Sequence, residues 1–153
     1  MSLSVWPLFA YAEPAQPDHS AALRVSMLDP VVVTPTLTSR TTEASLSSVT
    51  VIDEKQLRER QPQDMTEMLR GQPGVDITGN GAFGKATSVY LRGTGSSSTL
   101  LMVDGVRLRS ATAGSPSWQF LPTTLIDRIE IVRGPRGSLY GADAVGGVVQ
   151  VFT

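Results

Sequence analysis

Few residues in this chain of 153 could carry out chemistry. The sequence has no cysteine, which excludes a disulfide scaffold and a cysteine-rich metal site. Its one histidine, His19, lies in an N-terminal tail without a partner for metal binding or catalysis, and we assign it no role. No nucleophile, general base pair or metal-binding cluster is evident. We therefore expect no enzyme activity, no bound metal and no cofactor.

One stretch has the spacing of a dinucleotide-binding loop. Gly79 to Gly84 reads G-x-G-x-x-G, and Asp104 lies 20 residues after its last glycine. That fingerprint requires a helix directly after the third glycine, with its N-terminus facing the pyrophosphate, whereas Ser88 to Arg92 alternates like a strand. We interpret the stretch as a flexible apical loop, with a plain surface turn as the alternative. Its candidate ligand contacts are Asn80, Gly81, Phe83, Lys85 and Thr87.

A second candidate ligand loop, residues 110–117, is small and polar and leads into an aromatic pair. Trp118 of that pair could stack on a ligand or pack in the core. The candidate ligand contacts of this loop are Thr112, Gly114, Ser115 and Trp118.

The charges indicate what kind of partner the chain could bind. The formal net charge is only −1, but residues 1–84 hold six basic and ten acidic residues while residues 85–136 hold seven basic and three acidic ones. Eleven of the thirteen cations are arginine, which suits bidentate pairing with carboxylates at a partly buried interface; an ordinary solvated surface is the alternative. Because the cations alternate with apolar strand residues and form no lysine-rich tract, we expect no nucleic acid partner.

Short helices and strands must position these loops. A strand at Val49 to Ile52 is followed by Asp53 and Asp64, each with Gln or Glu three residues later, and this spacing predicts two capped helices. The first must end before Pro62 and the second at Gly71.

The second half reads mainly as strands. Asp104-Gly105 between alternating apolar residues predicts a hairpin with a type I′ turn. Pro122 starts a helical turn, and two strands, Ile129 to Val132 and Val148 to Phe152, are joined by a compact glycine-rich link. The predicted fold class is α+β: a small mixed β-sheet of about four strands with short helices and long loops.

The N-terminal residues 1–28 read as a signal remnant and a disordered linker. Met1 to Ala12 has a short apolar core and ends like a signal peptidase site, although it lacks a basic n-region; a disordered apolar tail is the alternative. Asp29 to Pro35, DPVVVTP, places three valines between two prolines. The prolines keep this segment extended and unsuited to a central strand, so it is either an edge strand lent to a partner or the first strand of the domain.

Four blocks in order resemble the plug domain of TonB-dependent outer-membrane receptors. They are Leu69 to Val75 (LRGQPGV), Val89 to Gly93 (VYLRG), Leu100 to Val106 (LLMVDGV) and Ile126 to Thr153 (IDRIEIVRGPRGSLYGADAVGGVVQVFT). Gln150 stands where the family usually has asparagine, and Gly137 where small residues vary. Among members of the family, PGVDIT at Pro73 to Thr78 and DGVRL at Asp104 to Leu108 resemble the cobalamin receptors.

The resemblance implies a gate for active uptake across the bacterial outer membrane. Residues 36–153 would be the plug, housed in the lumen of the receptor's own C-terminal β-barrel of about 22 strands. Residues 29–35 would be the Ton box, which faces the periplasm and adds a strand to the C-terminal domain of TonB. The residues for TonB binding would be Asp29, Pro30, Val31, Val32, Val33 and Thr34. The small-molecule substrate would be cobalamin; a siderophore or haem receptor plug and a free-standing periplasmic binding module are the alternatives.

The resemblance also assigns a role to two arginines. Arg92 and Arg133 each end a strand directly before glycine, in blocks whose arginines pair in the family with glutamates on the barrel wall. Both residues match, so they would lock the plug in place. The alternative is that both bond only within the plug, to carbonyl groups of the glycine-rich link.

Overall fold

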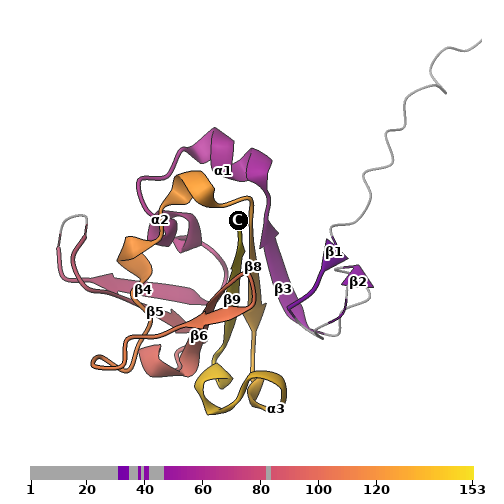
Figure 1. The fold of residues 1–153 in the computed structure, drawn as a ribbon, viewed down its shortest axis with the longest axis vertical. Helices are drawn as coiled ribbons and strands as arrows, with labels where there is room; N and C mark the ends of the chain where they lie inside the picture. The colour runs from indigo at the N-terminus through magenta and orange to yellow at the C-terminus, as the bar shows by residue number, and fades with distance from the viewer. Residues whose placement is uncertain (1–30, 35–37, 39, 42–46, 82–83) are drawn as a thin grey trace, which may run out of the picture.

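The computed structural model describes residues 31–34, 38, 40–41, 47–81 and 84–153, which form a mixed sheet with short helices against it (Figure 1). The predictions for residues 1–28 lie outside the described residues. The five strands of the central sheet occur in the spatial order β3 (Ser48–Ile52), β8 (Arg128–Arg133), β9 (Gly147–Phe152), β6 (Thr99–Val103) and β7 (Val106–Leu108).

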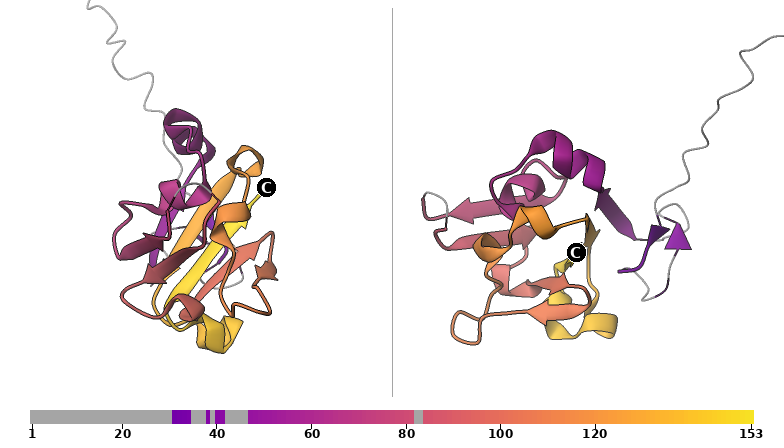
Figure 2. Two further views of the ribbon diagram at one scale, coloured as in Figure 1. Left: turned by 90° about the vertical axis from the view of Figure 1, so that its left-hand side faces the viewer. Right: turned by 45° about the horizontal axis from the view of Figure 1, so that its top comes forward.

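Only the pairing of β6 with β9 is parallel in this central sheet. Figure 2 shows β9 running through the middle of the sheet. The predicted α+β class with a mixed sheet is therefore confirmed, with five strands where about four were expected. Two antiparallel pairs stand apart from it: β1 (Val31–Val32) with β2 (Arg40–Thr41), and β4 (Val75–Gly79) with β5 (Thr87–Leu91).

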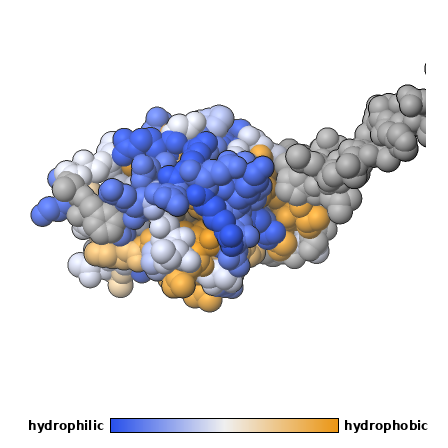
Figure 3. All heavy atoms as spheres, turned by 90° about the horizontal axis from the view of Figure 1, so that it is seen from above, coloured by the Kyte–Doolittle hydropathy of each residue, from blue (hydrophilic) through white to orange (hydrophobic). Residues whose placement is uncertain are grey.

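Both predicted helices form where their caps predict them. Helix α1 (Glu54–Arg60) begins after Asp53, whose carboxylate accepts from the Gln56 amide at 2.8 Å. Helix α2 (Met65–Leu69) begins after Asp64, which accepts from the Glu67 amide at 2.9 Å. The outer face of α1 is charged, and Figure 3 shows a hydrophilic surface when the molecule is viewed from that side.

Shorter helical turns connect the remaining strands. The glycine-rich link between β8 and β9, predicted as compact, contains two of them. These short elements are η2 (Ser96–Ser98), η3 (Trp118–Phe120), η4 (Thr123–Leu125), α3 (Gly137–Tyr140) and η5 (Ala142–Ala144). Within the described part of the chain, no helix is both long and apolar enough to span a bilayer.

The predicted hairpin at Asp104-Gly105 is also present. Asp104 has φ 45° and Gly105 φ 83°, as a type I′ turn requires, and Val103 pairs with Val106 on either side. Gly147 has a different role, because a Cβ atom built there would lie 2.3 Å from the Val132 carbonyl oxygen. The start of β9 therefore accepts no side chain.

The sheet buries two separate apolar layers. Alternation along β8 and β9 sends Ile129, Ile131, Val149 and Val151 toward α1 and α2, where the main core also contains Trp118. The opposite face buries a smaller cluster: Leu100, Met102, Tyr140, Ala144 and Val148. Two polar side chains, Glu130 and Gln150, also lie on this second face by alternation, and they are opposite each other in the register.

Candidate functional site

Arg133 at the end of β8 is a buried cation whose hydrogen-bonding capacity is only partly used. Its side chain is 6% exposed. Nε donates to the Pro73 carbonyl oxygen and Nη1 to the Thr50 hydroxyl at 2.8 Å, while the buried Nη2 has no hydrogen-bond partner among the described residues. A buried N–H without an acceptor is costly, so this guanidinium still has a bond to make.

Arg92, directly after β5, lies beside Arg133. A Cβ atom built at Gly74 would be 3.5 Å from Cγ of Arg92 and 3.7 Å from Cδ of Arg133, so the two side chains flank this glycine. Arg92 has φ 51°, and its amide donates to the Gly74 carbonyl at 2.8 Å. Burial, and then the neighbouring charge of Arg92, lower the pKa of Arg133 from its ordinary value.

Neither arginine has an acidic partner among the residues that the structure describes. Arg133 does bond within the plug, but to Pro73 and Thr50 and not to carbonyl groups of the glycine-rich link. The alternative interpretation of Arg133 as a cap of that link is therefore wrong. Pairing of the two arginines with a barrel wall stays a prediction.

Residues 31–34 are the described part of the stretch Asp29 to Pro35, called the valine segment from here on. They lie against the second face of the central sheet. Val31 and Val32 pair with Thr41 and Arg40 as a short antiparallel ladder, so this segment forms a strand within the chain. Val31 is 46% exposed, whereas Val32 is fully buried. Asp29 and Pro30, also predicted to bind TonB, lie outside the described residues. TonB binding by the segment stays a prediction.

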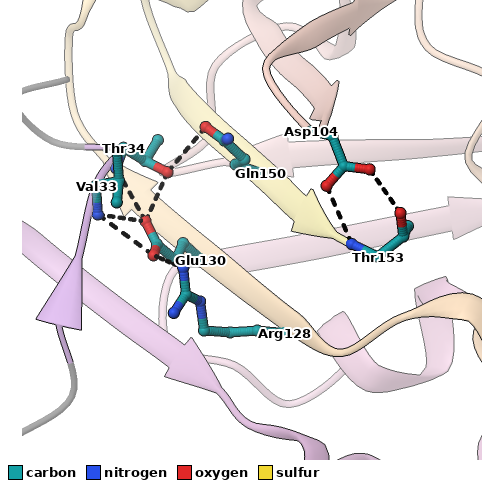
Figure 4. Close-up of polar contacts among 7 residues, drawn as sticks. All are labelled: Val33, Thr34, Asp104, Arg128, Glu130, Gln150 and Thr153. Carbon is teal, nitrogen blue, oxygen red and sulfur yellow. Dashed lines mark hydrogen bonds and ion pairs between the residues drawn. The ribbon is translucent and has the colours of Figure 1, made fainter. Parts of the chain in front are cut away.

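Glu130 holds the end of this segment (Figure 4). Its carboxylate is 0% exposed and accepts from the Val33 amide at 3.1 Å, the Thr34 amide at 2.9 Å and the Thr34 hydroxyl at 2.6 Å. On its solvent side Arg128 lies 3.1 Å from Oε1, and the Arg128 guanidinium stacks over the Phe152 ring at 4.2 Å. The buried charge is thus compensated by hydrogen bonds and one ion pair.

Two further side chains complete the contacts with Thr34. The Tyr140 hydroxyl donates to the Thr34 carbonyl at 2.8 Å, and the Gln150 amide group lies 3.1 Å from the Thr34 hydroxyl. Burial and the Glu130 charge raise the pKa of the Tyr140 phenol. Tyr140 therefore remains a protonated donor at neutral pH.

Glu130 is not among the functional residues predicted from the sequence. A signal was present, because a charged residue between two isoleucines in a strand buried on both faces requires a specific partner. The partner itself was not deducible, since Thr34 lies 96 positions away in the chain.

The two candidate ligand loops lie on the side of the molecule away from β1 and β2 (Figure 1). Asn80, Gly81, Lys85 and Thr112 are exposed. Thr87, Gly114 and Ser115 are half-buried, and Phe83 lies outside the described residues. Ligand contact by these residues stays a prediction.

Trp118 is the exception among these candidates. Its side chain is fully buried in the main core, so the prediction that it contacts a ligand is wrong and packing is its role. The exposed aromatic of this region is Phe120, at 71% exposure, which borders a shallow hollow with Arg109, Ser110 and Ser117. The sequence could not decide which of the two aromatic residues turns outward, because both lie in one short helical turn.

Comparison with known proteins gives the class to which this arrangement belongs. The family model of the TonB-dependent receptor plug domain matches residues 41–148, and the chain therefore belongs to that family. The resemblance found in the four sequence blocks is thus confirmed.

Individual relatives refine this picture. The chain is 39% identical over 132 residues to the vitamin B12 transporter BtuB of Vibrio vulnificus strain YJ016. The aligned region covers 86% of this chain and 22% of that relative. Among solved structures, the siderophore receptor PirA of Acinetobacter baumannii matches with a TM-score of 0.60 and 32% identity, over 72% of this chain and 18% of that one.

A mutant of the ferric enterobactin receptor PfeA from Pseudomonas aeruginosa matches with a TM-score of 0.61 and 30% identity, over 81% and 19% of the two chains. The chain thus spans about a fifth of the length of the proteins it matches.

Proposed function

We propose that this chain is the gate of a TonB-dependent active transporter in the bacterial outer membrane, housed in the lumen of a β-barrel. The observation that carries this proposal is the pair of arginines around Gly74. A buried guanidinium with an unused donor, beside a second cation and without an acid among the described residues, is best compensated by carboxylates outside the plug.

The arrangement of the candidate ligand loops and the valine segment agrees with a gate. The candidate ligand loops lie on one side and the valine segment on the other (Figure 1). A ligand bound at the loops and TonB bound at the valine segment would therefore act on opposite sides of the same plug. TonB would bind residues 29–35 by strand addition. The role is that of a binding and gating domain without catalysis.

Cobalamin is the substrate we propose. The support is the 39% identity to a vitamin B12 transporter and the PGVDIT and DGVRL segments. A siderophore is the second candidate, because solved structures with the same fold include siderophore receptors.

A binding titration of the full-length receptor separates the candidates. The receptor, purified in detergent, is titrated with cyanocobalamin, ferric enterobactin and haem, and intrinsic tryptophan fluorescence is followed. We expect saturable binding of cyanocobalamin alone. Binding of ferric enterobactin without cyanocobalamin would establish the siderophore candidate, and haem alone would establish a haem receptor. A receptor that binds none of them would contradict all three.

A further inference from the structure

Arg92 lies in a turn whose backbone conformation is unfavourable for its residue type. The turn runs from Leu91 to Thr94, and the Thr94 amide donates to the Leu91 carbonyl at 3.1 Å. Its two central residues, Arg92 and Gly93, have φ 51° and 73°, as in a type I′ turn. Such a turn prefers asparagine, aspartate or glycine at its first central position, because most side chains crowd the backbone when φ is positive. The surrounding structure must therefore hold Arg92 in this conformation.

Hydrogen bonds at both ends of the turn supply part of this restraint. The Arg92 amide donates to the carbonyl of Gly74, directly before β4, at 2.8 Å. The Thr94 hydroxyl donates to the Leu91 carbonyl at 2.8 Å, so that carbonyl accepts from the amide and the hydroxyl of the same threonine. Thr94 thus closes the turn with its side chain as well as with its backbone.

Gly146, in the link between β8 and β9, is the residue against which Thr94 packs. A Cβ atom built at Gly146 would overlap the Thr94 hydroxyl oxygen and would lie 3.1 Å from the Ser98 carbonyl oxygen. The Gly146 amide donates to the same Ser98 carbonyl at 2.9 Å. The link and the loop that follows the turn are therefore in direct backbone contact, with no room for a side chain between them.

The same glycine also contacts the segment that carries the second arginine. The Gly146 carbonyl accepts from the amide of Gly134 at 3.0 Å, and Gly134 directly follows Arg133. A Cβ atom built at Gly134 would lie 3.5 Å from Nη1 of Arg92, so the Arg92 guanidinium lies beside the residue next to Arg133. Gly146 thus connects the loop after Arg92 with the end of β8.

We propose that Thr94 and Gly146 are positioning residues for the pair Arg92 and Arg133. The inference rests on the proposed function, in which both arginines meet carboxylates outside the plug. Thr94 closes the turn and Gly146 supports it, so Arg92 keeps its orientation beside Arg133 before any carboxylate is bound. A guanidinium that is already oriented loses less conformational freedom when it forms a bidentate pair.

The test measures the passive conductance of the full-length receptor in planar bilayers. Gly146→Ala places a methyl group against the Thr94 hydroxyl, which should open the turn and raise the conductance about tenfold. Gly137→Ala is the matched control, because it adds the same group to the same link where a Cβ atom would meet nothing among the described residues within 4 Å beyond the local backbone. The control should conduct like the wild type. A closed trace from Gly146→Ala would overturn the inference.

A merely structural effect of Gly146→Ala is separated by repeating the measurement without Arg92. If Gly146 acts through Arg92, the substitution should add less than about twofold to the conductance of Arg92→Ala, because the side chain it positions is already absent. If the substitution only loosens the plug, the same increase should occur in both backgrounds, and the inference is then wrong.

The arginine variants separate this inference from the proposed function. A receptor with Arg92→Ala and Arg133→Ala that stays closed would overturn the pairing of the arginines with carboxylates outside the plug. If that receptor leaks while Gly146→Ala and Thr94→Ala stay closed, the pairing stands without help from the turn, and only the inference is wrong.

Thr94→Ala is the decisive variant if Gly146→Ala fails to assemble. It removes the hydroxyl that closes the turn and adds no atom, so it creates no overlap with Gly146. The conductance should rise about threefold, with no further increase in the Arg92→Ala background. Hydrogen exchange followed by mass spectrometry should be faster for the Thr94 amide in this variant and unchanged in β6. Wild-type exchange at Thr94 would contradict the role of its hydroxyl.

Discussion

Glu130 and Arg133 lie three positions apart on β8 and face opposite sides of the sheet. Both are nearly or fully buried, at 0% and 6% exposure. The carboxylate accepts from the valine segment and pairs with Arg128, whereas the guanidinium keeps one nitrogen without an acceptor and lies beside another cation. Of two buried charges on one strand, one is compensated by residues that the structure describes and the other is not.

This difference in charge compensation indicates a different role for each residue. A buried charge is stable when its hydrogen bonds are complete, and it is costly when they are not. Glu130 therefore works within the plug as a holder of its own N-terminal segment. Arg133, with Arg92, is arranged for a carboxylate supplied from elsewhere, which the proposed barrel would provide.

The largest effect expected from this comparison concerns the arginines in the complete receptor. If each of Arg92 and Arg133 pairs with a wall carboxylate, loss of both should raise the population of open plugs on the order of 100-fold. Arg92→Ala with Arg133→Ala should then increase passive conductance in planar bilayers without abolishing ligand binding. Arg70→Ala, at an exposed position after α2, is the control. A closed, wild-type trace from the double variant would show that these residues are not the lock.

A second prediction contrasts Glu130 with Arg133 in the 153-residue chain alone. Glu130→Ala leaves the amides of Val33 and Thr34 without an acceptor and should lower the free energy of unfolding by about 3 kcal/mol. Arg133→Met should cost less than about 1 kcal/mol, because it relieves a desolvated cation, and its partners Pro73 and Thr50 both retain access to water. Urea denaturation followed by circular dichroism measures both. A larger loss of unfolding free energy in Arg133→Met than in Glu130→Ala would contradict the comparison.

The smallest effect concerns an exposed carboxylate. Asp104 accepts from the Thr153 hydroxyl at 2.5 Å and from the Thr153 amide at 3.1 Å, and these bonds lower its pKa below the ordinary value of 3.8. Because the folded pKa is the lower one, the contact stabilises the fold above about pH 4 and is lost as the pH falls through the folded pKa. The Thr153 amide resonance should titrate below about pH 4 in NMR spectra. Asp104→Asn should abolish that titration, and a midpoint above 4 would contradict the assignment.

The sequence predicts the local elements of this fold well. Asp53 and Asp64 define helix starts, and Asp104-Gly105 defines a turn, because each signal depends on backbone groups within a few residues. The four family blocks also identify the two arginines. These are features whose physical cause is contained in a short stretch of chain.

The contacts of Thr34 depend on long-range pairing and were not predictable in the same way. The contacts of Thr34 with Glu130, Tyr140 and Gln150 span 96, 106 and 116 positions. They require β8 and β9 to be adjacent in register, which no local pattern specifies. The orientation of Trp118 depends likewise on the packing of its turn against α2, and the sequence left both orientations open.

The position of β9 has a consequence for how the plug folds. This strand comes last in the chain order of the five sheet strands, yet it lies between β8 and β6 in the middle of the sheet. The first strand of the sheet, β3, pairs only with β8, and Ser48 is opposite Arg133. A chain that emerges N-terminus first must therefore carry unpaired strands until β9 is available, and closing such long loops is slow. We expect the nascent chain to remain unfolded until β9 is complete, and to depend on chaperones to protect its exposed strand edges until then.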